Sequence, residues 1–161
     1  MNQITSTVNI NDQLSLKITL QPLNEITQEI RNKAKKVYGV IIIDDKLVLI
    51  YNSKRDIWGF PGGTIENNES IETALAREME EEAQLKVLHS QFLGYAWIDN
   101  ATDDLQLFFV VEGEKIKEFI ADPDGGVTEN RYININEWDT YLKWKEVGEY
   151  LISSAYNYSK K

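Results

Sequence analysis

The chain has 161 residues, 42% of them hydrophobic, and no cysteine. This composition is typical of one globular domain, and it excludes disulfides, zinc–thiolate sites and a cysteine nucleophile. The formal net charge of −9 argues against binding to duplex nucleic acid, which needs clustered lysine and arginine, and the single histidine, His89, excludes a multi-histidine metal site.

The start of the chain predicts an added hairpin. Residues Met1–Asn11 are polar and carry no secretory-signal pattern, and the longest apolar run, Val37–Ile43, is too short to cross a bilayer. We therefore expect a cytoplasmic protein without membrane contact. Leu14–Leu20 alternates between apolar and polar residues, which predicts a strand that follows a turn near Asn11-Asp12.

Apolar runs and glycine-rich or proline-rich breaks define the remaining elements in chain order. We expect a short helix at Asn24–Lys36, a hairpin of Val37–Ile43 and Leu47–Tyr51 joined by Asp44-Asp45-Lys46, a loop at Gly59–Gly63, a helix at about Glu69–Gln84 with Asn67 or Asn68 as its N-cap, strands at Val87–Trp97 and Leu105–Val111, a turn or loop at Asp122–Gly126, a strand at Arg131–Ile135, and a long helix at Asn136–Tyr156.

The last of these helices would pack through an amphipathic stripe of Trp138, Tyr141, Leu142, Val147 and Leu151. Strands and helices that mix within one compact chain predict an α/β fold, in which a mixed β-sheet is covered by helices.

Three glutamates carry the strongest chemical signal. Glu78, Glu81 and Glu82 stand at i, i+3 and i+4 on one helical face, and Glu78 and Glu82 fall on the arc that should face the core. Such a cluster repels itself and opposes the helix macrodipole, and its partial burial costs several kcal/mol unless it is compensated. Arg77 alone cannot balance this, whereas a divalent cation can. The alternative is a solvated acidic face, and Glu80, on the opposite arc, fits that description.

The spacing around these glutamates resembles the Nudix box of the MutT-like Nudix hydrolases. The matching fixed positions are Gly63, Glu69, Arg77, Glu78, Glu81 and Glu82, and the two apolar positions also match. The preceding Trp58-Gly59-Phe60-Pro61-Gly62 is also similar to family members. The chain departs from the box at Gln84, where the pattern has glycine. Because a non-glycine residue in the left-handed conformation costs roughly 1 kcal/mol, either Gln84 accepts that strain or the helix ends differently.

The resemblance implies a Nudix-type α/β/α sandwich over residues 35–157. We expect residues 1–34, with the predicted hairpin and short helix, to form an extension that packs on this domain, and a homodimer contact through it is one possibility. The implied cofactor is Mg²⁺, or Mn²⁺ as a substitute. Its expected ligands are Glu78, Glu81, Glu82 and the carbonyl of Gly62 or Gly63.

Roles for the other residues of the box follow from the same resemblance. Arg77 would orient the glutamates, unless it is only an exposed partner of Glu81. Glu69 would hold the loop against the helix.

The implied reaction is attack of water on phosphorus in a nucleoside diphosphate linked to another group. The implied catalytic residues are Glu78, Glu81 and Arg77, and Glu78 is the first candidate for the base. Three acids on a later segment are alternatives for that role, although each also fits an ordinary loop residue; they are Asp122, Asp124 and Glu129.

Substrate contacts are expected from two further groups of residues. Lys54 and Arg55 would meet distal phosphates or form a solvated surface pair. Tyr95, Trp97 and Phe109 would stack on a base or pack in the core.

Sequence marks of several Nudix subfamilies are missing outside the box, among them those of members that cleave NADH, diadenosine polyphosphates and coenzyme A. By elimination we expect a nucleoside triphosphate pyrophosphohydrolase. The alternatives are an ADP-ribose or nucleotide-sugar pyrophosphatase, a non-catalytic Nudix-fold nucleotide sensor, and a structural acidic domain that binds a partner through its charged surface.

Overall fold

The computed structural model describes residues 1–121 and 126–161. Its strands are β1 (Ile4–Asn9), β2 (Ser15–Pro22), β3 (Ala34–Ile43), β4 (Lys46–Asn52), β5 (Ile57–Gly59), β6 (Gly62–Thr64), β7 (Leu85–Ile98), β8 (Leu105–Lys115) and β9 (Val127–Asn134). Its helices are α1 (Gln28–Lys33), α2 (Ile71–Ala83), α3 (Trp138–Tyr141) and α4 (Lys145–Ser159), with a 3₁₀ turn at Ile135–Glu137.

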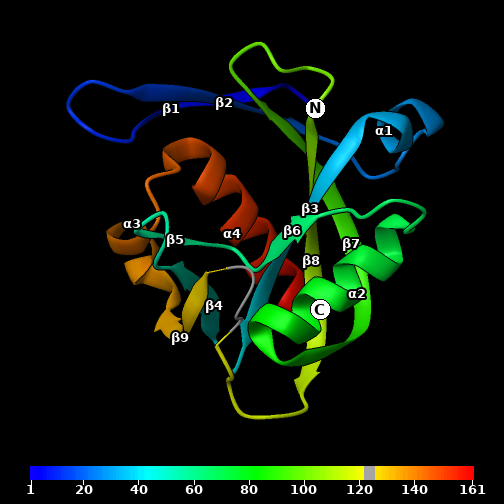
Figure 1. Ribbon diagram of the computed structural model, residues 1–161, viewed down its shortest axis with the longest axis vertical. Helices are drawn as coiled ribbons and strands as arrows, with labels where there is room; N and C mark the ends of the chain where they lie inside the picture. The colour runs from blue at the N-terminus through cyan, green and yellow to red at the C-terminus, as the bar shows by residue number, and fades with distance from the viewer. Residues whose placement is uncertain (122–125) are drawn as a thin grey trace.

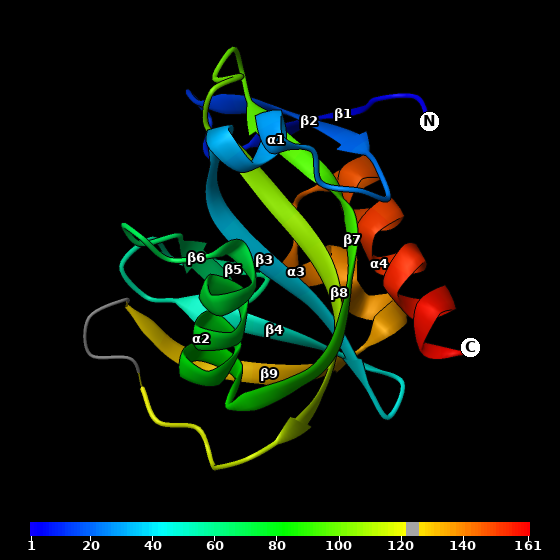
Figure 2. The same cartoon turned by 90° about the vertical axis from the view of Figure 1, so that its right-hand side faces the viewer.

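These strands form one curled, mixed sheet with the order β1-β2-β7-β8-β3-β4-β5 in the described ranges, while β6 pairs with β3 and β9 pairs with β4 (Figure 1). The β3–β8 pair is parallel and the other pairs are antiparallel. Helices α2 and α4 lie on opposite sides of the strands β3, β8 and β7 (Figure 2). The predicted α/β fold, a mixed sheet covered by helices, is confirmed.

Strand β3 explains how one sheet serves two hydrophobic cores. Val37 and Ile41 point toward the core that α2 covers, whereas Val40 points toward the core that α4 covers. A strand buried on both faces needs a nearly continuous apolar run, which is why Val37–Ile43 reads as unbroken rather than alternating.

The hairpin of β1 and β2 extends the sheet and covers the start of α4. Its turn lies at residues 10–14, near the predicted position, and β2 pairs with β7. The buried hydroxyl of Ser6 donates to Glu146 Oε2 at 3.0 Å and accepts from the Val147 N–H at 3.0 Å. Ser6 thereby satisfies an N–H in the first turn of α4, which has no intrahelical partner of its own.

Two helix starts or ends differ from the predictions. Helix α1 covers only Gln28–Lys33, since Ala34 is already extended and begins β3. Helix α2 begins at Ile71 because Ser70 caps it, accepting from the Thr73 N–H at 3.1 Å; the predicted caps Asn67 and Asn68 were therefore wrong.

The predicted long helix at Asn136–Tyr156 is broken into α3 and α4. Leu142 is extended and 1% exposed, so the chain leaves the helix in order to bury this side chain. Trp144 then packs edge-on against Phe60 and Phe108, with ring centroids 5.5 and 5.6 Å away. Burial of Leu142 and packing of the partly buried Trp144 outweigh the helix propensity of this segment. None of the helices in the two described ranges is both long and apolar enough to cross a membrane.

Candidate active site

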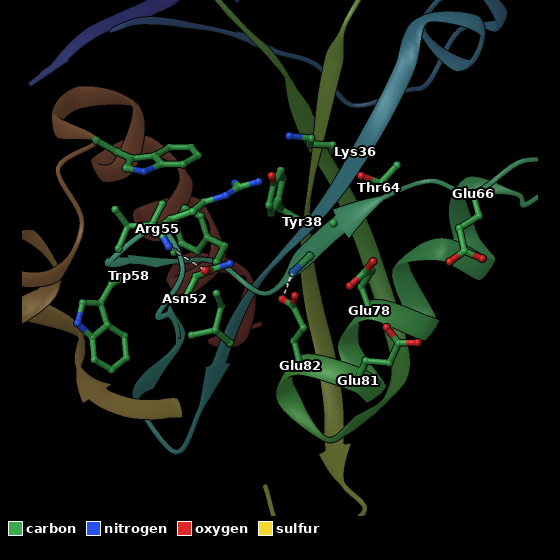
Figure 3. Close-up of a pocket in the computed structure, with 17 residues that line it drawn as sticks. Lys36, Tyr38, Asn52, Arg55, Trp58, Thr64, Glu66, Glu78, Glu81 and Glu82 are labelled. Atoms are coloured by element: carbon green, nitrogen blue, oxygen red, sulfur yellow. Dashed lines mark hydrogen bonds between the residues drawn. The ribbon is translucent and has the colours of Figure 1, made fainter. Parts of the chain in front are cut away.

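A cavity of about 650 Å³ lies between α2 and the strands that face it. One wall consists of Glu78, Glu81 and Glu82 from α2, which we call the carboxylate wall. On the opposite side are residues of β4, β5 and the turn between them, among them Asn52, Arg55 and Trp58, and strand β3 contributes Lys36 and Tyr38 (Figure 3). The predicted glutamates are thus brought together at one site.

The carboxylate wall has a mixed exposure. Glu78 and Glu82 are each 7% exposed, and they are the only charged residues that are buried within ranges 1–121 and 126–161. They share the helix face that carries Ala74 and Leu75 into the core. The side chain of Glu81, one turn after Glu78, is 50% exposed. Burial of two carboxylates on a core-facing stripe is costly unless other groups compensate their charge.

Arg77 connects helix α2 to the preceding loop and to two glutamates of the carboxylate wall. It bonds both oxygens of Glu69, from Nε to Oε2 at 2.8 Å and from Nη2 to Oε1 at 2.9 Å. Its Nη1 donates to Glu78 Oε1 at 2.9 Å and to Glu81 Oε2 at 3.3 Å, and its Nη2 also donates to the Thr64 carbonyl at 3.0 Å. The arginine therefore does more than pair with an exposed Glu81.

These contacts shift the ionisation of both partners. The hydrogen bonds from Arg77 hold the pKa of Glu69 at about 2, helped by the Glu66 N–H, which donates to Glu69 at 3.0 Å. In return, the hydrogen bond to Glu69 is the main cause that raises the pKa of Arg77 above its ordinary value. Both groups are fully charged at neutral pH, as a charge-assisted, two-pronged pair requires.

Two glycines bring the loop backbone against the carboxylate wall. The Gly62 N–H donates to Glu82 Oε2 at 2.8 Å. A Cβ on Gly62 would lie 2.1 Å from the Val37 carbonyl oxygen, and a Cβ on Gly63 would lie 2.6 Å from Glu78 Oε1. Strand β6, which pairs Gly62 with Tyr38 and Gly63 with Val37, creates this approach. Any larger residue at either position would displace the backbone or the carboxylate.

The donor set of this site suits a hard divalent cation. Among the residues that the structure describes, no three carboxylate or histidine side chains converge as a ready-made cage. Mg²⁺ does not need one, because it takes one or two carboxylates and fills its octahedron with water and substrate phosphates. Glu78 and Glu82 on one buried face, next to the Gly62–Gly63 backbone, supply oxygen ligands of that kind, so the residues fit the ion.

The structure shows how helix α2 ends at Gln84, the one position at which the chain departs from the box. It adopts the left-handed conformation, φ 53° and ψ 41°, and its N–H bonds the Met79 carbonyl. The helix thus ends in the manner expected of a glycine cap, and Gln84 accepts the strain, the first of the two outcomes considered above.

Among the described candidates for a phosphate contact or a later acid, only Arg55 lies at this cavity. Arg55 lines the cavity, whereas the side chain of Lys54 lies against Gly126 and is not part of the lining. Glu129 pairs with Arg131 at 2.6 Å and does not line the cavity either. Two further candidates, Asp122 and Asp124, lie outside the described residues.

Tyr95, Trp97 and Phe109 are not at this site. Phe109 is 5% exposed and packs in the core under α2. Tyr95 and Trp97 stand two residues apart on one face of β7, where they pack beside α1 and line a separate cavity of about 370 Å³. The sheet therefore does not bring these rings to the carboxylate wall: Phe109 packs in the core, the alternative considered for it, and Tyr95 and Trp97 lie at the end that α1 covers.

The sequence reasoning gave no role at the site to several lining residues, among them Lys36, Tyr38, Trp58 and Trp144. Lys36 and Tyr38 are two residues apart on β3, and strand alternation would have placed them on one face. Burial raises the pKa of Tyr38 to about 12, so its hydroxyl stays protonated at neutral pH. Trp58 was noted only as part of the family resemblance, and Trp144 was concealed by the break between α3 and α4.

Comparison with known proteins places this site in a family. The family model for the NUDIX domain matches residues 33–153. An 8-oxo-dGTP diphosphatase of Buchnera aphidicola is 38% identical over 60 residues, which cover 35% of this chain and 46% of that protein. An RNA pyrophosphohydrolase of Saccharophagus degradans is 42% identical over 59 residues, 35% of each chain. The matched segment thus spans less than half of either relative.

A solved structure supports the same conclusion at the level of fold. The crystal structure of a Bacillus subtilis pyrophosphohydrolase superposes with a TM-score of 0.58, at 21% identity, over 73% of this chain and 72% of that one. Because the box residues, the fold and a family model that matches most of the chain agree, this protein belongs to the Nudix hydrolase family.

Proposed function

We propose that this protein uses Mg²⁺ to hydrolyse a phosphoanhydride bond in a nucleoside diphosphate linked to another group, and that nucleoside triphosphates are its substrate class. The observation that carries the proposal is the charge pattern of the cavity. Buried Glu78 and Glu82 form one side, and the cations Lys36 and Arg55 line the same space. A polyphosphate fits such a site when a divalent cation stands between it and the carboxylates.

Glu78, Glu81, Glu82 and the backbone at Gly62–Gly63 are the proposed metal-binding groups. Bound Mg²⁺ would neutralise phosphate charge and lower the pKa of a coordinated water. Glu82 is held by the Gly62 N–H and Glu78 by Arg77, so both carboxylates keep fixed positions before substrate arrives. Fixed positions reduce the reorganisation that the reaction would otherwise require.

Glu78 is our first candidate for the general base and Glu81 the second. Glu78 is buried beside Gly63, where a carboxylate that accepts a proton from water would be shielded from solvent. Glu81 is half exposed and has a longer bond to Arg77, which leaves it free to move. Arg77 acts in this scheme as a positioning residue for both glutamates.

Lys36 and Arg55 are proposed to bind the phosphates, and Trp58 and Trp144 the nucleobase. Both cations line the cavity, and neither has an ion pair with a residue in ranges 1–121 and 126–161. Trp58 contacts the guanidinium of Arg131, 4.8 Å from its ring centre, and packs at 86° against the ring of Tyr141. A ring fixed in this way offers a stacking surface at little cost in conformational entropy.

The names of the matched relatives support a triphosphate over the alternative substrates. One is named for 8-oxo-dGTP and the other for RNA. The net charge of −9 makes a long RNA the less suitable of the two, because binding of a polyanion depends on many basic contacts. The presence of all three glutamates of the carboxylate wall favours catalysis over a sensor that only binds nucleotide.

The test is phosphate and pyrophosphate release from a panel of canonical and oxidised nucleoside triphosphates, triphosphorylated RNA, ADP-ribose and nucleotide sugars. Each is assayed with Mg²⁺ and with Mn²⁺. Glu82→Gln can keep the bond from Gly62 while it removes a charge, and we expect it to lower kcat by about 100-fold or more. Glu80→Gln, on the exposed face of the same helix, is the matched control and should retain activity. A wild-type protein that binds nucleotide with metal but turns over none of these compounds would contradict the proposal.

A further inference from the structure

We propose that Gln84 is a positioning residue that, through Asn130, ties the end of helix α2 to strand β9 and so fixes the carboxylate wall relative to the opposite side of the cavity. This inference rests on the proposed function, because it assigns Gln84 a part in forming the metal site. It concerns the one position at which the chain departs from the box.

The side chain of Gln84 is bonded at both ends. Its Oε1 accepts from Asn130 Nδ2 at 2.7 Å, and its Nε2 donates to the Glu81 carbonyl at 2.9 Å. Its own backbone carbonyl accepts from the Ile116 N–H at 3.0 Å. Gln84 is 1% exposed, so these bonds lie where water cannot easily replace them.

The tie joins the two sides of the cavity. On one side, Gln84 holds the carbonyl of Glu81, whose neighbour Glu82 bonds Gly62. On the other side, Asn130 is the β9 partner of Ile50 on β4, and Ile50 lines the cavity. The amide–amide bond therefore fixes how far the last turn of α2 stands from β4 and β9.

Glycine could not make this connection. It would adopt the left-handed conformation without strain, but it has no side chain to reach Asn130. The chain retains a strained, buried amide whose polar atoms are satisfied, and this arrangement is explained if the connection itself has a function. A cap alone would need only the N–H bond to Met79.

Two variants remove the tie from opposite ends. Gln84→Gly deletes one amide and relieves the backbone strain, whereas Asn130→Ala deletes the other amide and keeps every residue of α2 and its cap. Gln91→Ala removes an exposed amide on β7 and serves as the control. The double variant Gln84→Gly/Asn130→Ala tests whether the two amides act as one unit.

The first readout is the affinity for Mn²⁺ alone, measured by electron paramagnetic resonance on the full chain. The second is hydrogen exchange of residues 79–86. We expect each single variant to weaken Mn²⁺ binding by about five- to thirty-fold, the double variant to be no weaker than the worse single variant, and exchange at the end of α2 to rise. Gln91→Ala should change neither quantity.

Variants that lower the melting temperature but keep Mn²⁺ affinity within two-fold of wild type would overturn the proposal, because the tie would then be only structural. Fully additive effects of the two single variants would also overturn it. If wild-type protein itself binds no Mn²⁺, the result contradicts both the metal site of the proposed function and the role of Gln84. If wild type binds Mn²⁺ and the variants bind equally well, only the role of Gln84 fails.

Discussion

Arg77 and Glu69 are joined by two parallel hydrogen bonds of 2.8 and 2.9 Å. Because Glu69 directly precedes Ser70, the N-cap of helix α2, these bonds link the helix to the loop before it. Only a planar guanidinium offers two donors in this fork while a third N–H reaches another carboxylate, here Glu78. The same side chain therefore anchors the loop before the helix and orients one of the proposed ligands.

Replacement of Arg77 by lysine should impair the site although the charge is kept. Lysine cannot bond both oxygens of Glu69 and still reach Glu78, so we expect kcat/KM to fall by about ten- to one-hundred-fold. The unfolding free energy, from urea denaturation, should fall by about 2 kcal/mol. Arg31→Lys is the control, because its pair with Glu72 is exposed and is worth at most about 1 kcal/mol. Equal activity of the two variants would show that Arg77 is not a positioning residue.

The lowered pKa of Glu69 predicts a specific loss of stability in acid. Its folded-state pKa is about 2, against an ordinary value of 4.5. A carboxyl group with a depressed folded pKa stabilises the fold fully above pH 4.5, and this contribution is lost as the pH falls from 4.5 to about 2. Urea denaturation at pH 5, 4, 3 and 2.5 should therefore give a steeper decline for wild type than for Glu69→Gln. Parallel curves for the two proteins would mean that Arg77 does not hold this pKa down.

Local sequence patterns predicted those features of the site that depend only on residues close together in the chain. The burial of Glu78 and Glu82 on one helix face followed from their spacing, and the left-handed cap at Gln84 was one of two expected outcomes. Both depend on helix geometry within a few residues, which the sequence specifies directly.

Features that depend on distant packing were not predicted. The periodicity after Asn136 continues as if through one helix, and the break is explained only by the burial of Leu142 and by the packing of the partly buried Trp144 against Phe60 and Phe108. Likewise, the partner of Gln84 lies 46 residues later in the chain, so no local pattern could indicate it. The position of Tyr95 and Trp97 away from the carboxylate wall also depends on distant pairing, because the sheet order takes β7 to the side covered by α1.

The two cavity cations should control substrate affinity more than turnover. Lys36→Met and Arg55→Met each remove one proposed phosphate contact, which corresponds to about 1.5 kcal/mol. We therefore expect KM for a nucleoside triphosphate to rise by about ten-fold in each variant, with kcat within three-fold of wild type. Lys86→Met, an exposed lysine on β7, is the control. Unchanged KM values in both variants would remove these residues from the phosphate site, and a fall in kcat alone would point to a role in the chemical step.

Three glycines near the site should respond differently to alanine, because their surroundings differ. A Cβ at Gly63 would meet the carboxylate of Glu78 at 2.6 Å, which a side chain can relieve by moving. Gly63→Ala should therefore lower kcat by ten-fold or more while the unfolding free energy changes by less than about 1 kcal/mol. A Cβ at Gly62 would meet the Val37 carbonyl at 2.1 Å, so that variant should lose about 3 kcal/mol of stability.

Gly59 provides the matched control, since a Cβ there has no atom within 4 Å. Gly59→Ala should leave kcat unchanged and the unfolding free energy within about 0.5 kcal/mol of wild type. The measurements are steady-state kinetics and urea denaturation of all three variants under one condition. If Gly63→Ala were as active as Gly59→Ala, Glu78 would not need its present position, and its assignment as ligand and first-choice base would have to be abandoned in favour of Glu81.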